Sequence, residues 1–567
     1  MISASLRINR WPGIKHSMVA TVNSGESCFE IPLLVRATST DTQNNSMDHL
    51  PFTETPELKH VPSLPIFGSM LTWHSGIPGN SFSQPYDFWP EMNKRYGGFY
   101  TIGLPGGGRR DDIRRTAYVI TDPREVVKVI RNTGQFPSGI LEAFWVNIKW
   151  MKSRGLASLG LFRRGHEWKR LRTFLQTDML HPDSARGFVP GILEAAYLAS
   201  KGAQAASDDM NLYLQRCAFD MFASAMLGEL TQVADSTTAT DPENERFVSS
   251  SSQGLGLATS MVFDPKENIL GNIFGVETEK CKKAFEGFDE AWAIGQAKFA
   301  RFMQIRKEGK LNDVQKMSYL CRALDRQEAE DSNVSIKEVQ ELTWLGLFAA
   351  VDTTSTVLRW NAIHLARLPD VQERLYLELV TAVEMYGENG RLTAEVLDKK
   401  HTPYLHAVVR ESTRLTPLIP IFINKTIQAD NPVPVHKEFL HTGDVVLMEV
   451  MSTFHNPLIV DDPDEFRPER WFPDQVERRK GTYREIIDHP FLKEPFSQGA
   501  RKCSGSRIAI NEIHIMIAQL VLDWNFVIHA DHKPRILSWK DIPYQRLTAI
   551  EPQLPPFHLT PRRKSII

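Results

Sequence analysis

The stretch that decides the fold is EPFSQGARKCSGSRIAINEI, Glu494 to Ile513. Its single cysteine, Cys503, lies between Gly499 and Gly505 and directly before an apolar helical pattern. The glycines permit tight turns and a close approach of the backbone to a bound group. At the start of a helix, free backbone N–H groups and the helix dipole favour a thiolate over a thiol. We therefore expect Cys503 to be a metal ligand or a nucleophile.

The neighbours of Cys503 in the sequence narrow this choice. A catalytic thiolate normally works with a histidine base, and a zinc site needs further close ligands; this loop contains neither. An axial thiolate to haem iron needs only one cysteine. It also needs an apolar ring against the macrocycle, for which Phe496 is the candidate, and a cation for a propionate, for which Arg501 is the candidate. The simplest alternative is a buried cysteine in an ordinary loop.

The loop resembles the haem-binding signature of the cytochrome P450 family, F-x-x-G-x-R-x-C-x-G. The five fixed positions are Phe496, Gly499, Arg501, Cys503 and Gly505. Three further segments resemble motifs of this family and follow in the same order: AAVDTTS at 349–355, ESTR at 411–414 and FRPERW at 466–471. The resemblance implies a mainly α fold with small β sheets. It places the haem b between a long central helix and the helix that follows the cysteine.

The predicted central helix begins at a capping-box pattern, Ser335 with Glu338 three residues later. By the resemblance, Ala349 and Ala350 in its middle leave room for dioxygen next to haem. The pair after them, Asp352 and Thr353, would relay protons and hold water or oxygen. The family usually has glycine in place of Ala350, so we expect a slightly tighter groove. The alternative is a mid-helix threonine that bonds back to a carbonyl and bends the helix.

Two further groups of residues are expected to support the haem. Glu411 and Arg414 lie three apart on one helix face, and by the resemblance they form a buried triad with Arg470 that holds the cysteine loop. The alternative is a solvated surface pair. Trp168 and Arg172, four apart, resemble the family's propionate donors. Where the family often has an arginine for a propionate, this chain offers Lys425, and whether Lys425 replaces it stays open.

The resemblance implies a monooxygenase that inserts one oxygen atom from O2 into a C–H bond of a lipophilic substrate, sterol-like or another lipid. The substrate-facing candidates are Phe348, Leu418, Ile419 and Ile421. One alternative is an isomerase or dehydratase of lipid hydroperoxides with the same fold, which tends to lose the acid–alcohol pair. The other is a haem-binding protein without enzymatic activity, which does not need that pair.

Electrons must come from outside, because the chain has no flavin or nicotinamide motif. The mitochondrial branch of the family carries basic residues one and five places before the motif glutamate; here these are Arg410 and His406. We therefore expect a ferredoxin, with its reductase, as the donor. The mitochondrial inner membrane, on its matrix face, is the expected location. The alternative is the endoplasmic reticulum membrane.

The N-terminal residues 1–55 resemble a mitochondrial transit segment with a linker, and residues 56–567 are expected to form the catalytic domain. Arg7, Arg10 and Lys15 precede the first acidic residue, Glu26. The alternative is a disordered basic tail. The formal net charge of −2 gives no reason to expect a nucleic-acid partner.

The segment KENILGNIFG is a candidate for peripheral membrane contact, with the alternative that it belongs to the core. Its apolar residues are Ile269, Leu270, Ile273 and Phe274.

Overall fold

The computed structural model divides the chain into two compact units, Met1–Glu54 and Thr55–Ile567. It describes residues 4–11, 14–24, 27–33, 57–63, 69, 85–103, 116–137, 145–156, 165–235, 237, 241–330, 332–419, 421–493, 495–545 and 550–562. The interpretation of residues 1–55 as a targeting segment stays a prediction.

The first unit contains an antiparallel sheet in the order β1-β2-β3. Its strands are β1 (Ala4–Trp11), β2 (Ile14–Ser24) and β3 (Ser27–Leu33). The sequence gives only a weak signal for these strands, because the alternation of apolar residues at Met18, Ala20 and Val22 is short and is surrounded by polar and basic residues.

The second unit is mainly helical, which confirms the expected fold class. Its α-helices are α2 (Pro85–Tyr96), α3 (Pro123–Arg131), α4 (Trp145–Ser153), α5 (Gly165–Met179), α6 (Pro182–Lys201), α7 (Met210–Leu227), α8 (Pro242–Phe263), α9 (Pro265–Glu267), α10 (Glu279–Lys307), α11 (Asp313–Met317), α12 (Tyr319–Gln327), α13 (Ile336–Arg367), α14 (Pro369–Tyr386), α15 (Pro403–Leu415), α16 (Met451–Phe454), α17 (Pro473–Arg479), α18 (Pro490–Lys493) and α19 (Ser506–Asp523). A π-helical turn, η4 (Asn268–Ile273), and three 3₁₀ turns, η5 (Pro468–Trp471), η6 (Tyr483–Asp488) and η7 (Trp539–Asp541), complete the helical elements.

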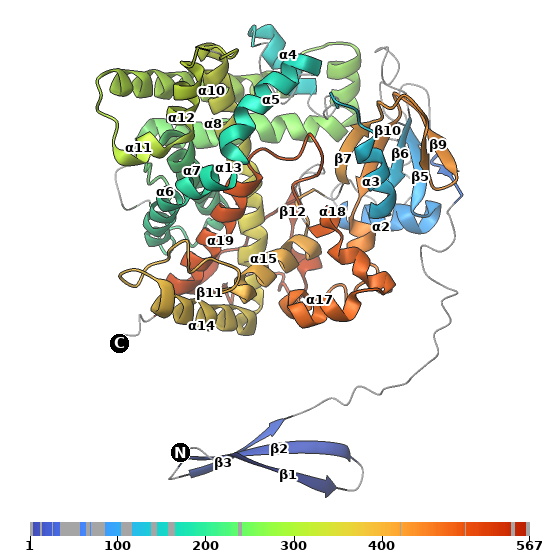
Figure 1. The fold of residues 1–567 in the computed structure, drawn as a ribbon, viewed down its shortest axis with the longest axis vertical. Coiled ribbons are helices and arrows are strands. Elements are labelled where there is room, and N and C mark those ends of the chain that lie inside the picture. The colour runs from blue at the N-terminus through green and yellow to red at the C-terminus, as the bar shows by residue number, and fades with distance from the viewer. Residues whose placement is uncertain are drawn as a thin grey trace. The chain divides into compact units, whose positions relative to one another are not determined.

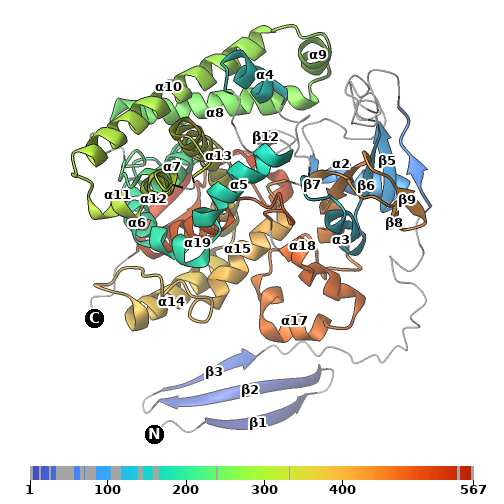
Figure 2. The same cartoon turned by 45° about the horizontal axis from the view of Figure 1, so that its top comes forward.

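The strands of this unit form small sheets. The largest has five strands in the order β4-β5-β6-β10-β7, and the pairs β8-β9, β11-β14 and β12-β13 form the others. The strands are β4 (Lys59–His60), β5 (Phe99–Gly103), β6 (Thr116–Ile120), β7 (Ile421–Thr426), β8 (Val433–Val435), β9 (Glu438–Leu440), β10 (Val445–Glu449), β11 (Trp524–Ile528), β12 (Tyr544–Gln545), β13 (Glu551–Pro552) and β14 (Phe557–Pro561). Figures 1 and 2 show the five-stranded sheet with α2 and α3 on one side of the unit and the long helices on the other.

Helix α13 is the central element of the helical part. Its predicted capping box is confirmed, since the Ser335 side chain accepts from the Glu338 amide and the Glu338 side chain accepts from the Ser335 amide. Its 32 residues extend over about 48 Å at 1.5 Å per residue. Most of its side chains are buried, including charged ones, because α7 and α19 pack against it. A helix that is buried on several sides provides a rigid wall for an interior site.

Helix α19 follows the cysteine loop and packs against α13, α6 and α14. Its apolar pattern explains this position, since Ile508, Ile515, Met516 and Leu520 are almost completely buried. Among the described residues, we find no helix with the length and hydrophobicity needed to cross a bilayer.

Candidate active site

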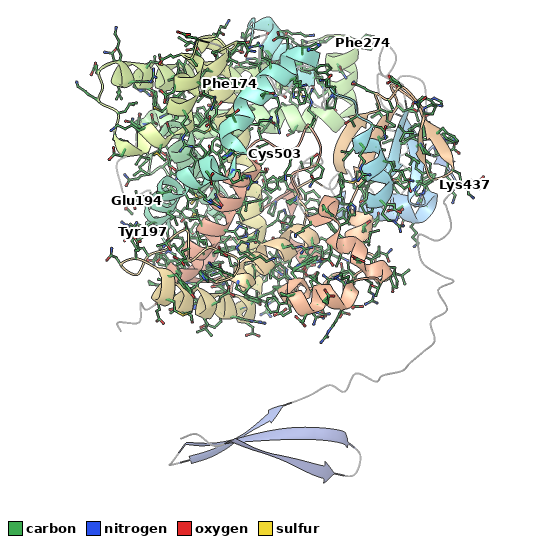
Figure 3. All side chains as sticks on the ribbon, viewed as in Figure 1. Phe174, Glu194, Tyr197, Phe274, Lys437 and Cys503 are labelled. Atoms are coloured by element: carbon green, nitrogen blue, oxygen red, sulfur yellow. The ribbon has the colours of Figure 1, made fainter. Side chains whose placement is uncertain are left out.

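A cavity of about 770 Å³ lies between α13 and the start of α19, and Cys503 is exposed to it. Figure 3 shows Cys503 near the middle of the helical part, whereas Phe274 and Lys437 lie at the outline of the molecule. The Cys503 amide donates to the Phe496 carbonyl at 3.0 Å, which closes the loop. Phe496 also lines the cavity.

The two signature glycines have different structural roles. Gly499 adopts a positive φ of 78°, and a Cβ atom there would approach Ile130 Cγ2 to 2.8 Å, so this position requires glycine. Gly505 has an ordinary φ of −85° and is the N-cap of α19. A Cβ atom at Gly505 would make only a normal contact with Met179, but Gly505 lines the cavity and thus allows a bound group to come close.

Burial and the start of α19 act in opposite directions on the thiol of Cys503. Burial raises the pKa of the Cys503 thiol, and this effect exceeds the opposite effects of the Gly505 amide and of the positive charges on Arg172 and Lys502. The helix start therefore does not compensate for the loss of hydration. Coordination to a metal ion deprotonates such a thiol outright, so thiolate formation at Cys503 depends on the ligand that it binds.

The residues around this loop fit a buried anionic group such as a haem propionate. Trp168 and Arg172 lie one turn apart on α5, both are buried, and the indole Nε1 and the guanidinium Nε have no hydrogen-bond partner among the described residues. Arg501 places its guanidinium 4.1 Å from the Trp168 ring centroid and donates from Nε to the Pro137 carbonyl at 3.0 Å. Unpaired buried donors are unfavourable, and a carboxylate at this place would satisfy them.

We expect Trp168→Phe to weaken haem retention by roughly tenfold, because the variant keeps the ring but removes one hydrogen bond to a charged group. The measurement is the rate of haem transfer to apomyoglobin. Trp524→Phe is the matched control, since the Trp524 indole donates to the Ser200 carbonyl at 2.9 Å and not to the cavity. Equal rates of haem loss in both variants would contradict the role of Trp168.

The middle of α13 borders the cavity through Phe348, Ala349, Ala350 and Thr353. The Thr353 hydroxyl donates to the Ala349 carbonyl at 3.1 Å, which is the back-bond expected for a mid-helix threonine. Because this bond uses the only hydroxyl proton, the oxygen of Thr353 can accept a hydrogen bond from water in the cavity.

Asp352 lies on another side of the same helix. It is buried, and its Oδ1 accepts from Gln215 Nε2 at 3.2 Å and from Ser252 Oγ at 3.1 Å, on the side of α7 and α8. It is not among the residues that border the cavity. The structure therefore does not bring the predicted acid and alcohol together on one surface.

A second acid–alcohol pair borders the cavity and was not found from the sequence. Thr354 donates to Glu512 Oε2 at 3.3 Å, and Glu512 Oε1 has no partner among the described residues. Burial raises the pKa of Glu512 to about 8, which favours the neutral carboxylic acid at pH 7. Its signal in the sequence is an acidic residue in the middle of the apolar pattern of α19.

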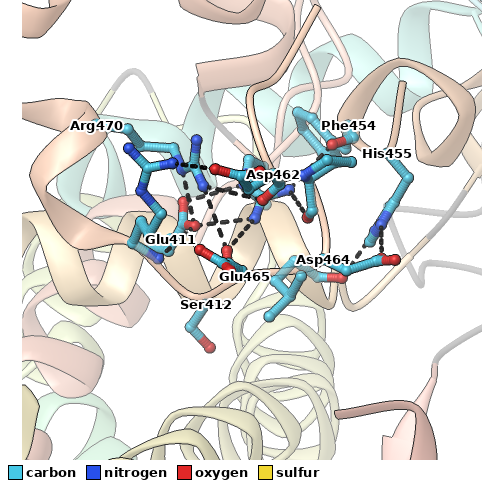
Figure 4. A network of polar contacts seen from close by, with 12 residues as sticks. Glu411, Ser412, Phe454, His455, Asp462, Asp464, Glu465 and Arg470 are labelled. Carbon is cyan, nitrogen blue, oxygen red and sulfur yellow. Dashed lines mark hydrogen bonds and ion pairs between the residues drawn. The ribbon is translucent and has the colours of Figure 1, made fainter. Parts of the chain in front are cut away.

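The predicted triad is assembled in the structure (Figure 4). Glu411 Oε1 accepts from Arg414 at 2.9 Å and from Arg470 Nε at 2.9 Å, and its Oε2 accepts from Trp471 Nε1 at 2.9 Å. Arg414 also donates to the carbonyls of Phe454 and Pro463. Burial acts to raise the pKa of Glu411, but the charges and hydrogen bonds of Arg414 and Arg470 exceed this effect and lower it.

The two predicted contacts for a redox partner lie close to the cavity but are not free cations. Arg410 pairs with Asp488 at 3.1 Å and stacks on the Trp471 ring at 3.6 Å. Burial lowers the pKa of His406, whose Nε2 is bonded to a backbone carbonyl and whose ring lies 4.2 Å from that of His514. His406 is therefore neutral at pH 7 and does not provide the positive charge expected of a basic residue at this position.

The predicted substrate-facing residues are placed as follows. Phe348, Leu418 and Ile419 border the cavity. The side chains of Ile421 and Lys425 lie outside the described residues, although their strand β7 pairs with β10.

Comparison with known proteins decides the family. The model of the cytochrome P450 family matches residues 59–550, which is most of the chain. The chain belongs to the cytochrome P450 family. Members of this family are monooxygenases that bind haem b. Cys503 and Arg172 border the cavity described above, and the indole of Trp168, unpaired among the described residues, lies one helical turn from Arg172.

Individual relatives are distant from this P450. The mitochondrial cholesterol side-chain cleavage enzyme of Sus scrofa is 24% identical over 80% of this chain and 84% of its own. The mitochondrial sterol 26-hydroxylase of Rattus norvegicus is 32% identical over 32% of each chain. Probable cytochrome P450 6a13 of Drosophila melanogaster is 28% identical over 34% of this chain and 36% of its own. The last two matches therefore span about a third of the relatives' length.

Proposed function

We propose that this P450 inserts one oxygen atom from O2 into a C–H bond of a sterol-like lipid, with electrons from a ferredoxin. The observation that carries the proposal is the cavity that joins Cys503 to the apolar half of α13. Haem held by Cys503, with Trp168, Arg172 and Arg501 at its propionates, would supply the activation of dioxygen. The two relatives with sterol-related names support this substrate class.

The residues of the chain would act on water, protons and substrate. The Thr353 oxygen would hold a water molecule in the cavity. Ala349 and Ala350 would leave space for dioxygen, whereas Asp352 is bonded to Gln215 and Ser252 and does not border the cavity. The apolar side chains of Phe348 and Leu418 would exclude bulk water and bind the substrate.

We expect Thr353→Ala to lower the product formed per electron pair consumed by roughly tenfold, because it removes one hydrogen bond that positions water for proton transfer. Thr353→Ser keeps the hydroxyl and is the matched control. The measurement compares product, oxygen uptake and hydrogen peroxide in a reconstituted system with a sterol. Unchanged coupling would contradict the role of Thr353, and product formation without a reductant would favour the isomerase alternative.

The proposed electron donor is supported by a group of cations that border the same cavity as Cys503. Lys399 and Lys493 are exposed and border the same cavity as Arg410. Partial burial lowers the pKa of Lys399, and the positive charges of Lys493 and Arg410 lower it further. Such a surface is complementary to an acidic ferredoxin. In our proposal, the partner contact therefore lies at Lys399 and Lys493.

We expect the double variant Lys399→Glu, Lys493→Glu to raise the KM for ferredoxin roughly tenfold at low salt, with a smaller effect at high salt. Lys437→Glu is the control, because this exposed lysine lies at the outline of the molecule, clearly separated from Cys503 in Figure 3. An equal KM for both variants would contradict the proposed contact.

The mitochondrial inner membrane, on its matrix face, is the proposed location, and two of the three relatives described above carry that organelle in their names. Phe274 and Val276, which follow η4, are 63% and 46% exposed and would provide a peripheral membrane contact. Leu270 is partly buried, while the side chains of Ile269 and Ile273 lie outside the described residues.

A further inference from the structure

Aromatic rings from three helices form one wall of the cavity. Trp150 of α4, Phe288 of α10, and Trp344 and Phe348 of α13 all border the cavity and are each at most 5% exposed. They contact one another in a closed circuit with ring centroids 5.1 to 5.5 Å apart. Each ring has only two side-chain torsions, and its neighbours fix it further. The wall is therefore rigid before any ligand binds.

A polar contact behind the wall fixes the Trp150 ring. Its Nε1 donates to Asp289 Oδ1 at 2.9 Å, and the same carboxylate pairs with Arg154 at 2.6 Å. A rigid apolar wall favours a rigid ligand, because a flat ring system contacts it without losing the torsional freedom that a flexible acyl chain would lose.

Two polar groups interrupt this apolar region: the carboxamide of Asn147, and the indole Nε1 of Trp344, which is buried without a hydrogen-bond partner among the described residues. Asn147, Trp150 and Met151 lie at positions i, i+3 and i+4 of α4 and present one face to the cavity. Asn147 is 8% exposed, and its carboxamide makes no hydrogen bond to a described residue. All other described lining residues from α4, α7, α8, α10 and α13 up to Phe348 are apolar or aromatic: Trp150, Met151, Phe222, Leu255, Phe288, Leu342, Trp344, Leu345, Gly346 and Phe348.

The position of Asn147 matters for the orientation of a ligand. Helix α4 lies at the outer edge of the helical part, clearly separated from Cys503 (Figures 1 and 3). The carboxamide of Asn147 faces the cavity and offers both a donor and an acceptor to a ligand oxygen. A ligand bonded to Asn147 would extend along the aromatic wall toward the middle of α13.

We infer that the substrate is a rigid polycyclic lipid with one hydroxyl or carbonyl oxygen remote from the oxidised carbon, and that the Asn147 carboxamide hydrogen-bonds this oxygen. The inference rests on the proposed function and specifies the substrate class of the same site. Asn147 determines specificity in this account and takes no part in oxygen activation or proton transfer.

We would titrate two haem-loaded proteins, the wild type and Asn147→Leu, with cholesterol and with cholest-5-ene, which lacks the hydroxyl. Binding is followed by the change in haem absorbance when the ligand displaces water from the iron. Palmitic acid is the flexible comparison. We expect the wild type to bind cholesterol about fivefold to tenfold more tightly than cholest-5-ene, which corresponds to about 1 to 1.4 kcal/mol. Asn147→Leu should remove this difference by weakening cholesterol alone, whereas the control Leu255→Ala should weaken both sterols equally.

Three outcomes would overturn the inference: the same discrimination in Asn147→Leu as in the wild type, no absorbance change with either sterol, or tighter binding of palmitic acid than of cholesterol. The carbon-monoxide spectrum of the reduced proteins distinguishes a failure of this inference from a failure of the proposed function. A thiolate-type spectrum in both proteins preserves the proposed function and leaves the titrations to decide the inference. Its absence from the wild type would overturn both.

Discussion

Glu411→Gln should lower the free energy of unfolding by about 3 to 5 kcal/mol, because it leaves the buried guanidinium groups of Arg414 and Arg470 without their counter-charge. The measurement is urea unfolding of the haem-loaded proteins. Glu469→Gln is the matched control: Glu469 lies close by in η5 but pairs with Arg374 at the surface, where about 0 to 1 kcal/mol is expected. A similarly small decrease in the free energy of unfolding in both variants would show that the triad does not stabilise the fold.

The same variant should change the dependence of stability on pH. The pKa of Glu411 is lower in the folded chain than in the unfolded chain, so its ionisation contributes stability above the unfolded pKa. This contribution is lost as the pH falls through the folded pKa. The free energy of unfolding should therefore decrease less steeply between pH 7 and pH 3 in Glu411→Gln than in the wild type. Parallel curves of this free energy against pH would contradict the explanation.

Cys503→Ser should lower product formation by roughly a thousandfold or more, because a serine hydroxyl does not replace the electron-donating thiolate at the iron. Product is measured with the reconstituted electron donor, and haem content is measured in the same preparation. Cys321→Ser is the control, since Cys321 is buried in α12 and does not border the cavity. Appreciable turnover by a haem-loaded Cys503→Ser protein would show that another group activates oxygen.

The sequence predicted those parts of the site that depend on local pattern. The capping box at Ser335, the turn at Gly499 and the spacing of Glu411 and Arg414 each follow from a few neighbouring residues, and the structure has all of them. The sequence also predicts the central helix well. A long stretch with apolar residues at helical spacing, preceded by a capping box, is compatible with few structures other than a long buried helix.

The remaining features depend on contacts between distant segments. The pKa of Cys503 is set by burial, which a helix-dipole argument does not include. Asp352 turns toward Gln215 and Ser252, which the sequence gives no reason to place beside it. The stretch WVNIKWMKS gave no signal of a binding wall, because the role of Asn147 and Trp150 appears only when α10 and α13 pack against α4.

The central claim is that the sulfur of Cys503 bonds to haem iron, and iron K-edge X-ray absorption of the purified protein tests it most directly. The account predicts one sulfur atom in the first coordination shell of the wild-type iron, which is lost in Cys503→Ser and kept in Cys321→Ser. A wild-type shell of nitrogen and oxygen alone, or a sulfur signal that survives in Cys503→Ser, would contradict it.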